Sequence, residues 1–464
     1  MTHFDAVVLG AGPGGYMAAI RCAQLGLKTA IVESQWWGGT VNAAGLPMKA
    51  LLRNAEVAHL IKHESATYGI TGDLSCDYSA AFARSRAVGD RMVQSVHFLM
   101  RKNKITEYNG WGTFKSPTAL SVSFDTGVVE SLTFDNCIIA TGALPRLPES
   151  VKKGTRIITY AELVTSPILP ASIIICGAGA IGAEFAYILA NYGTKVTLVE
   201  EADRILARED AEVSAEVAKA YRSLGVTIVT GQSIRQISQD DQAATVRLAP
   251  ASGGEELVLQ GDQVLVSMGF QPRTQGYGLA TTGAALTEHG AIAVDDHMRT
   301  SVSGLYAVGD VTGKAMLAQV AVQQGVLAAE TIGGVQTFPI DYAMVPRATY
   351  SQPQVASFGH TEAQARQRGY DVRTNKFPLS ASGQAWALGQ TSGFVKIVAD
   401  AAHHEILGVH MVGVNATELL PELVLARMWD LTTDEIGRVM HVHPSLSEAV
   451  REAALGVDGP MLSF

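Results

Sequence analysis

Short apolar runs alternate with helical patterns along most of this chain. An apolar run over residues 6–9 predicts a strand, the pattern over 14–25 predicts a helix, and residues 29–33 predict the next strand. The same order of strand, glycine-rich turn, helix and strand returns over residues 173–200. We interpret this recurrence as an internal repeat, which predicts two nucleotide-binding units of the same design.

The pattern is different outside this repeat. Residues 54–104 are largely helical and polar on one face, and the apolar runs at 132–140 and 304–308 predict two more strands. From about residue 346 onward, strand-like runs mix with helical patterns, as in a separate α+β domain. We therefore expect an α/β chain of several domains that pack tightly, without a long linker.

The first glycine-rich turn reads Gly10-Ala11-Gly12-Pro13-Gly14-Gly15 and lies between a predicted strand and a predicted helix. In this spacing Gly10 allows a tight turn, Gly12 lets the backbone approach a pyrophosphate, and Gly15 permits close packing of helix and strand. The start of the helix then faces the phosphates. Glu33 ends the second strand, where its carboxylate can accept hydrogen bonds from an adenosine ribose. This combination predicts a dinucleotide site.

The second glycine-rich turn reads Gly177-Ala178-Gly179-Ala180-Ile181-Gly182, and Glu200 closes the strand that follows its helix. A carboxylate at that place favours the free 2′-hydroxyl of NAD over the 2′-phosphate of NADP. Arg204 is near enough in sequence to weaken this preference, so NADP stays possible. Two such turns in one chain predict electron transfer between a nicotinamide nucleotide and a tightly held flavin.

Composition and charge exclude several classes of function. Only 17% of the residues are charged and the net charge is -9, which argues against nucleic acid as a partner. The apolar runs are too short to span a bilayer, and no leader precedes the first strand, so we expect a cytoplasmic protein. No metal site is predicted. The cysteines, each interpreted as a small buried hydrophobe, lack CxxC or CxxxxC spacing; they are Cys22, Cys76, Cys137 and Cys176.

Several short segments outside the two glycine-rich turns form a recognisable set. They are Gly38-Gly39-Thr40, Pro47-Met48-Lys49, Ala140-Thr141-Gly142, Ala307-Val308-Gly309-Asp310, Gly408-Val409-His410-Met411-Val412-Gly413 and His443-Pro444-Ser445-Leu446-Ser447-Glu448. Together they resemble the dihydrolipoamide dehydrogenase branch of the pyridine nucleotide–disulfide oxidoreductases along essentially the whole chain. The resemblance implies FAD and NAD as cofactors and a homodimer.

The resemblance also implies the domain organisation. The fold class is α/β, with two Rossmann-like dinucleotide-binding domains and a C-terminal α+β dimerisation domain. Residues 1–145 and 276–340 should form the FAD-binding domain, 146–275 the NAD-binding domain, and 341–464 the dimerisation domain. These bounds are expectations from the family.

The family also implies roles for single residues. Asp310 should hold the flavin ribityl chain, and residues 316–319 should run under the isoalloxazine ring. Lys49 should lie near flavin N5 and pair with Glu184, which would place a positive charge beside the reduced flavin. Cofactor contacts are implied as well for Gly14, Gly39, Thr40, Lys49, Gly112, Thr141, Gly142, Gly269, Gly309, Leu317 and Ala318.

Residues 38–49 depart from the family pattern. The family has two cysteines here, which form a disulfide against the flavin, whereas this chain has no cysteine and one residue fewer between the flanking motifs. Counting back from Lys49 puts Gly45 at the second cysteine position, and the first falls at Thr40 or Val41. These residues cannot form a mixed disulfide, so the usual thiol chemistry is not expected.

His443 and Glu448 are nevertheless present. In the family this dyad comes from the partner subunit, and the carboxylate orients the imidazole that accepts a proton from a thiol. Without a thiol, the segment either serves only to build the dimer interface or lets His443 move a proton to or from a substrate that reacts directly with the flavin. In the second case the active site is shared between the subunits.

The leading prediction is an FAD-dependent NAD(P)H oxidoreductase. Its reduced flavin would pass electrons directly to a small-molecule acceptor that is not a disulfide, such as a quinone-like or other conjugated compound. One alternative is a flavin-binding structural or regulatory subunit without catalysis, and another is a dihydrolipoamide dehydrogenase-type reductase that uses another thiol. Two minor expectations concern other residues. Trp36 and Trp37 should pack in the core, although they could instead line a pocket, and Glu209 and Asp210 should lie on a solvated face.

Overall fold

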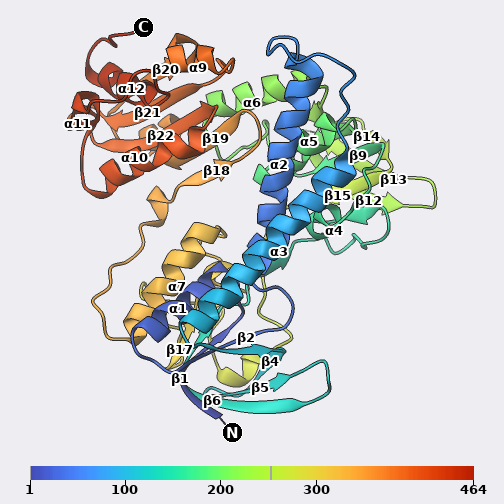
Figure 1. Ribbon diagram of the computed structural model, residues 1–464, viewed down its shortest axis with the longest axis vertical. Helices are drawn as coiled ribbons and strands as arrows, with labels where there is room; N and C mark the ends of the chain where they lie inside the picture. The colour runs from blue at the N-terminus through green and yellow to red at the C-terminus, as the bar shows by residue number, and fades with distance from the viewer. Residues whose placement is uncertain (1, 251–252) are drawn as a thin grey trace. The chain divides into compact units, whose positions relative to one another are not determined.

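The computed structural model describes residues 2–250 and 253–464 of the chain. The chain divides into two compact units, each assembled from three separate stretches of sequence (Figure 1). The first unit comprises Met1–Ala50, Ala80–Arg146 and Gly269–Tyr342. The second comprises Leu51–Ser79, Leu147–Met268 and Ala343–Phe464.

A seven-stranded sheet forms the centre of the first unit. Its strand order is β3-β2-β1-β6-β5-β4, and β17 pairs with β6. The strands are β1 (Thr2–Leu9), β2 (Thr29–Glu33), β3 (Thr106–Asn109), β4 (Trp111–Ser116), β5 (Ala119–Ser123), β6 (Val129–Ile139) and β17 (Leu305–Ala307). The predicted strand at 29–33 is confirmed with the same bounds. β1 begins before the apolar run because Thr2 and His3 still pair with β6.

Helices cover the first sheet. α1 (Pro13–Gln24) follows the first glycine-rich turn, with proline at a position where its missing N–H costs nothing. α1 packs along α7 (Ala318–Ile332), which comes from the last of the three stretches of sequence in this unit. The end of α3 (Tyr78–Lys102) also packs on this sheet, through Val96 and Met100. A short π-helical turn, η1 (Val41–Gly45), leads into α2 (Leu46–His59), which continues into the second unit from Leu51 onward.

The second unit contains a parallel sheet, which repeats the design of the parallel strands β3, β2, β1, β6 and β17 in the mixed sheet of the first unit. The strand order in the second unit is β11-β10-β9-β15-β8. The strands are β8 (Ile157–Ile158), β9 (Ser172–Cys176), β10 (Lys195–Val199), β11 (Thr227–Val229) and β15 (Gln263–Val266). α5 (Ala180–Asn191) connects β9 to β10 in the same way that α1 connects β1 to β2. The internal repeat that the sequence predicts is therefore confirmed.

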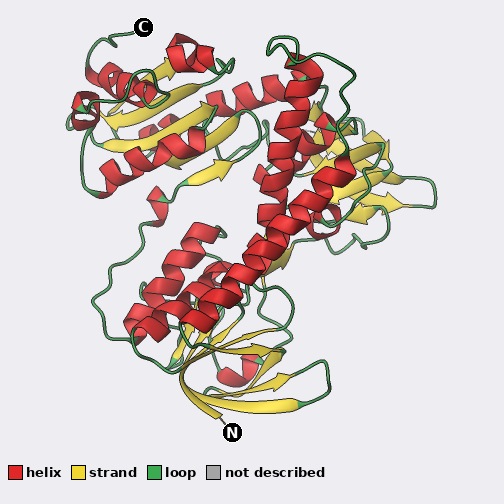
Figure 2. Cartoon of the chain, in the orientation of Figure 1, coloured by secondary structure: helices red, strands yellow, loops and turns green. Residues whose placement is uncertain are grey.

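Two antiparallel sheets complete the second unit (Figure 2). The smaller one consists of β12 (Gln232–Gln239), β13 (Ala244–Pro250) and β14 (Leu257–Gly261). The larger one has the order β18-β19-β22-β21-β20. Its strands are β18 (Arg347–Thr349), β19 (Gln354–Gly359), β20 (Val372–Pro378), β21 (Phe394–Asp400) and β22 (Ile406–Gly413). This is the predicted α+β domain.

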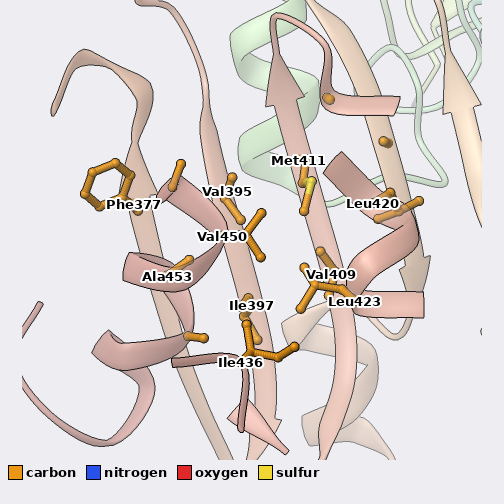
Figure 3. Packing of buried hydrophobic residues seen from close by; sticks show 14 of the residues in the cluster. Phe377, Val395, Ile397, Val409, Met411, Leu420, Leu423, Ile436, Val450 and Ala453 are labelled. Atoms are coloured by element: carbon orange, nitrogen blue, oxygen red, sulfur yellow. The ribbon is translucent and has the colours of Figure 1, made fainter. Parts of the chain in front are cut away.

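Apolar side chains from sheet and helices fill the core of the C-terminal domain. α10 (Ala416–Met428), α11 (Thr433–Arg438) and α12 (Glu448–Asp458) contribute to it together with β20, β21 and β22. Figure 3 shows this packing and labels some of the buried residues, namely Phe377, Val395, Ile397, Val409, Met411, Leu420, Leu423, Ile436, Val450 and Ala453. Burial on both sides explains why β22 is apolar except for His410, whose Nε2 lies 3.0 Å from the carbonyl oxygen of His360.

The predicted helical segment 54–104 is interrupted. α2 ends at His59, a short π-helical segment η2 (Leu60–Glu64) follows, and α3 begins only at Tyr78. Between them Gly69 and Gly72 have φ of 69° and 114°, a conformation that ends a right-handed helix.

Burial corrects several minor expectations. Glu209 and Asp210 are buried, so the solvated face predicted for them is wrong. Their partners come from strands of the C-terminal domain, which the local pattern does not reveal. Trp37 lies in the core as predicted, but Trp36 is 38% exposed. Cys76 is only partly buried, whereas the other three cysteines are buried as expected.

Candidate functional site

The first glycine-rich turn has the geometry of an anion site. Gly10 has φ of 104°, and a Cβ there would lie 2.4 Å from the carbonyl oxygen of Ala140, so only glycine fits. Gly12 precedes the first turn of α1, and among the described residues no side chain caps this helix end. The first N–H groups of α1 are therefore available to a bound phosphate. These residues fit the pyrophosphate of a dinucleotide.

The second glycine-rich turn repeats this geometry in the second unit. Gly177 has φ of 105°, and a Cβ there would lie 2.3 Å from the carbonyl oxygen of Ser267. Gly179 precedes α5, and no side chain within residues 2–250 and 253–464 caps that helix end. Gly182 lies in the first turn of α5, as Gly14 and Gly15 lie in α1. The chain therefore carries two turns of equivalent geometry, each of which fits a phosphate group.

Each turn is tied to an acid at the end of the neighbouring strand. Glu33 Oε2 accepts a hydrogen bond from Ala11 N at 2.8 Å, and Glu200 Oε2 accepts one from Ala178 N at 2.8 Å. The separation along the chain is 22 residues in both cases. A carboxylate has about four lone-pair sites. Oε1 of Glu33 already accepts from the backbone N–H groups of residues 34–36, which leaves the second lone pair of Oε2 for a ribose hydroxyl. Within the described residues, Oε1 of Glu200 accepts only from Ala202 N, so Glu200 can also accept from a ribose hydroxyl. Both predicted ribose acids thus lie beside their turns.

Arg204 is engaged by its own loop. Its Nη1 lies 3.0 Å from Asp203 Oδ1, and its Nη2 donates to the carbonyl oxygen of Ala207 at 3.2 Å. The guanidinium is therefore partly neutralised and is less available to a 2′-phosphate.

Asp310 and the start of α7 follow the last strand of the first sheet. Asp310 lies in a short 3-10 turn, η4 (Gly309–Thr312), directly after β17. Burial raises the pKa of its carboxyl to about 6. Leu317 and Ala318 mark the start of α7. No side chain in the described part of the chain caps this N-terminus of the helix. A buried acid and a second open helix start in the first unit fit a polar cofactor such as FAD.

The remaining predicted cofactor residues lie mainly at strand ends. Thr141 Oγ1 donates to the carbonyl oxygen of Arg273 at 2.9 Å, beside Gly142. Gly269 precedes β16 (Phe270–Pro272), which pairs with β7 (Ala143–Pro145). In β4, Gly112 has a packing role, because a Cβ there would lie 2.5 Å from Leu9 Cδ1.

Residues 38–49 lie against the first glycine-rich turn. Gly38 N donates to the carbonyl oxygen of Ala11 at 2.8 Å. A Cβ on Gly39 would lie 2.7 Å from Gly12 Cα, so the two turns approach closely. Thr40 then precedes η1, the turn that includes Val41 and Gly45. A Cβ at Gly45 would meet no atom nearer than Thr40 O at 3.7 Å, so the space of a small side chain is open there.

Lys49 lies in α2 within the first unit, and Glu184 lies in α5 within the second. The carboxylate of Glu184 is buried and accepts a hydrogen bond from Tyr350 N at 2.9 Å. Backbone support therefore fixes Glu184, and its pairing with Lys49 stays a prediction.

His443 and Glu448 form a hydrogen-bonded pair. His443 Nδ1 lies 2.8 Å from Glu448 Oε1, and Ser445 N donates to Glu448 Oε2 at 2.9 Å. Burial opposes ionisation of Glu448, but the bonds from Ser445 and His443 outweigh it and lower its pKa. The His443 side chain is 80% exposed. His441 differs, because its side chain is buried and bonds Glu422 at 2.9 Å.

The structure adds a contact that the sequence analysis missed. Arg86 Nη1 in α3 donates to the carbonyl oxygen of Ala43 in η1 at 2.9 Å. The available signal was Pro47, which has no N–H to offer the carbonyl four residues before it. Spacing alone does not say which side chain supplies the missing donor.

The described residues also bear on disulfide formation, metal binding and membrane insertion. All four cysteines are free thiols. Among the described residues, no cluster of three or more His, Cys, Asp or Glu side chains could hold a metal ion. Within the same residues, no helix is both long enough and apolar enough to cross a membrane.

Comparison with known proteins gives consistent matches. The family model of the pyridine nucleotide-disulphide oxidoreductases matches residues 4–325. The model of the dimerisation domain of the same family matches residues 345–454. The second match supports a homodimer. The dihydrolipoyl dehydrogenase of Mycobacterium tuberculosis is 52% identical, with 100% of each chain covered. That of Corynebacterium glutamicum is 50% identical, covering 100% of this chain and 99% of the relative.

Solved structures show the same fold. LpdA from Mycobacterium tuberculosis has a TM-score of 0.89 at 26% identity, covering 98% of this chain and 99% of that one. The HOCl-induced flavoprotein disulfide reductase RclA from Escherichia coli, as its Cu(II) complex, has a TM-score of 0.88 at 25% identity, covering 99% and 100%. The chain therefore belongs to the pyridine nucleotide-disulphide oxidoreductases, a family of oxidoreductases in which the dihydrolipoyl dehydrogenases use FAD and NAD(H).

Proposed function

We propose that this chain is an FAD-dependent NAD(P)H oxidoreductase without the redox-active cysteine pair, which passes electrons directly to an acceptor that is not a disulfide. The observation that carries the proposal is the absence of cysteine from residues 38–49, where the family has its pair. A quinone-like or other conjugated organic compound is the acceptor class. Such an acceptor would lie beside η1, where Gly45 leaves space for it.

The remaining thiols support this proposal. Burial raises the pKa of the Cys22 and Cys176 thiols to about 12, and it raises that of Cys137 as well. The thiolate is the reactive form in disulfide exchange, so burial makes these three groups inert near neutral pH. Cys76 has no second cysteine within the segment that links α2 to α3.

The predicted cofactor residues have the roles that the family assigns. FAD would be held by the first glycine-rich turn, Glu33, Thr141, Asp310 and Ala318, and when bound it supplies a two-electron redox centre. The second glycine-rich turn and Glu200 would bind the nicotinamide nucleotide. In this proposal the residues of the chain orient the two nucleotides and the acceptor, and one side chain handles the proton.

His443 is the proposed proton-transfer residue. Glu448 accepts the bond from Nδ1, which leaves Nε2 as the atom that can give or take a proton. Its exposure suits a side chain that acts on the other subunit of a homodimer. The active site would then require both subunits.

An anaerobic titration with NADH, followed by visible absorbance, tests the proposal. We expect the flavin to bleach at one equivalent of NADH, without a long-wavelength thiolate–flavin band, and the reduced protein then to reduce a quinone. If the oxidised spectrum persists with excess NADH and NADPH, the proposal fails and a flavin-binding subunit without catalysis is favoured.

The names of the relatives favour a second candidate. Proteins 50% and 52% identical to this chain are dihydrolipoyl dehydrogenases, so reduction of a lipoamide-type disulfide through another thiol is the alternative. Replacement of all four cysteines by serine decides between the two. Loss of turnover in a folded, FAD-loaded variant supports the thiol route, and unchanged turnover excludes it.

A further inference from the structure

Pro47 leaves one carbonyl group of η1 without its regular donor. In a continuous helix the carbonyl of Ala43 would accept from the N–H four residues later, but that residue is Pro47. The turn is instead wound more widely, and Leu46 N donates to the carbonyl oxygen of Val41, five residues earlier. The carbonyl of Ala43 can therefore accept from a donor outside the turn.

Arg86 of α3 supplies that donor. Its Nη1 lies 2.9 Å from the carbonyl oxygen of Ala43. A hydrogen bond from a guanidinium is stronger than one between neutral groups, and it holds the acceptor in a narrow range of positions. Arg86 is half-buried, which limits the competition from water.

The next turn of α3 contacts the same segment through its backbone. Gly89 lies three residues after Arg86, on the same face of the helix. A Cβ at Gly89 would lie 2.6 Å from the carbonyl oxygen of Asn42 and 3.1 Å from Pro47 Cγ. Two successive peptide groups of η1, those of Asn42 and Ala43, thus rest on one face of α3.

We infer that Arg86 is a positioning residue for the electron acceptor. It fixes η1 and with it the small side chains that stand where the family has cysteines, and so sets the space in which the acceptor binds. This inference rests on the proposed function, because it takes the acceptor to lie beside η1. Small displacements of the residues that border a binding site weaken both the binding and the alignment of a reactant.

The test compares Arg86→Met with Arg84→Met in the FAD-loaded protein. Arg84 is two residues away on the same helix, and it donates to Ala50 O in α2 at 3.2 Å. Its replacement by methionine therefore removes the same charge and side-chain length as Arg86→Met but leaves the bond to Ala43 in place. With NADH as donor and 1,4-benzoquinone as acceptor, Arg86→Met should raise the KM for the quinone about tenfold. Flavin reduction by NADH should stay within about twofold of the wild type, and Arg86→Lys should restore much of the KM.

Hydrogen exchange over residues 40–50 gives a readout that does not depend on turnover. Arg86→Met should speed exchange of Leu46 N–H, and Arg84→Met should not. Gly89→Ala is a second variant, since its Cβ must displace η1 while Arg86 stays, and it should raise the KM in the same direction. An unchanged KM with unchanged exchange in Arg86→Met overturns the inference, as does an equal effect of Arg84→Met. If the wild type fails to reduce benzoquinone, the proposed function fails, and the exchange rates alone decide whether Arg86 holds the turn.

Discussion

Lys396 Nζ lies 3.2 Å from Asp210 Oδ2, and both side chains are buried in the second unit. Lys396 comes from β21 of the C-terminal domain, whereas Asp210 caps α6 (Ala211–Ser223) beside the second parallel sheet. Glu212 and Glu362 also lie within 3.3 Å of the ammonium group. Burial lowers the pKa of Lys396, but its acidic partners outweigh that effect and raise it. Within the second unit, this cluster joins β21 to the start of α6 through charge.

Lys396→Met should destabilise the protein by about 3 kcal/mol. Removing the cation leaves Asp210 buried without its counter-ion, and breaking a buried pair on one side costs about 3–5 kcal/mol. Lys376→Met is the matched control, because Lys376 also pairs with Glu212 but its side chain is 45% exposed; it should cost under about 1 kcal/mol. Chemical denaturation of both variants measures the difference, and equal midpoints would contradict it.

The contribution of this cluster should depend on pH in the acidic range. Burial raises the pKa of Glu212, but the bonds from Lys376 and Lys396 prevail and hold it below the ordinary value of 4.5. A depressed carboxyl pKa gives stability that is present above the unfolded-state value and is lost as the pH falls through the folded-state value. The stability difference between wild type and Lys396→Met should therefore be constant from pH 5 to 8 and shrink below about pH 4.5. A difference that grows on acidification would refute this assignment.

The two nucleotide-binding turns were predictable because their determinants are local. Gly10 needs a positive φ, Glu33 lies one strand away, and the same spacing returns at Glu200. Such rules act over about twenty residues, which a sequence pattern records completely. The resemblance added the remaining positions, several of which lie at strand ends and helix starts, and their cofactor contacts stay predictions.

Long-range partners were not predictable in the same way. Asp210 is bound by Lys396, 186 residues later in the chain, so its acidic neighbourhood resembled a solvated face. Arg86 reaches Ala43 across 43 residues, and the proline that creates the need does not identify the donor. Pairing of this kind depends on the tertiary fold, and local propensity does not predict which distant residues will pair.

Glu200→Ala should weaken both NADH binding and discrimination against NADPH. The variant loses the acceptor for Ala178 N and for a ribose hydroxyl, which should lower kcat/KM for NADH about tenfold or more. The ratio of NADH to NADPH efficiency should fall with it, because a negative charge that repels the 2′-phosphate is gone. Glu201→Ala is the control, since Glu201 bonds Ser233 Oγ at 2.7 Å and not the turn. Steady-state kinetics with both nucleotides measure the effect, and a ratio equal to that of wild type would exclude the role.

His443→Gln should slow turnover with a quinone about 100-fold while flavin reduction by NADH stays unchanged. General acid–base catalysis by a positioned histidine contributes about this factor, and the residue is proposed to act after the flavin is reduced. Stopped-flow absorbance separates the two half-reactions. His441→Gln is the control, because His441 is held by Glu422. Unchanged quinone turnover in His443→Gln would leave the segment only its role in building the dimer interface.

Gly45→Cys should return a thiolate to the flavin site. A Cβ at this position meets only Thr40 O, at 3.7 Å, so the new side chain fits without displacing η1. On reduction with NADH, the variant should show a long-wavelength thiolate–flavin absorbance that the wild type lacks. Its intensity should fall as the pH drops below the thiol pKa, because the thiolate is the electron donor of such a band. Ala43→Cys, in the same turn, is the control and should show no band. If neither Gly45→Cys nor the double variant with Val41→Cys gives one, then η1 does not occupy the place of the family's redox disulfide, and the acceptor position argued from it is wrong.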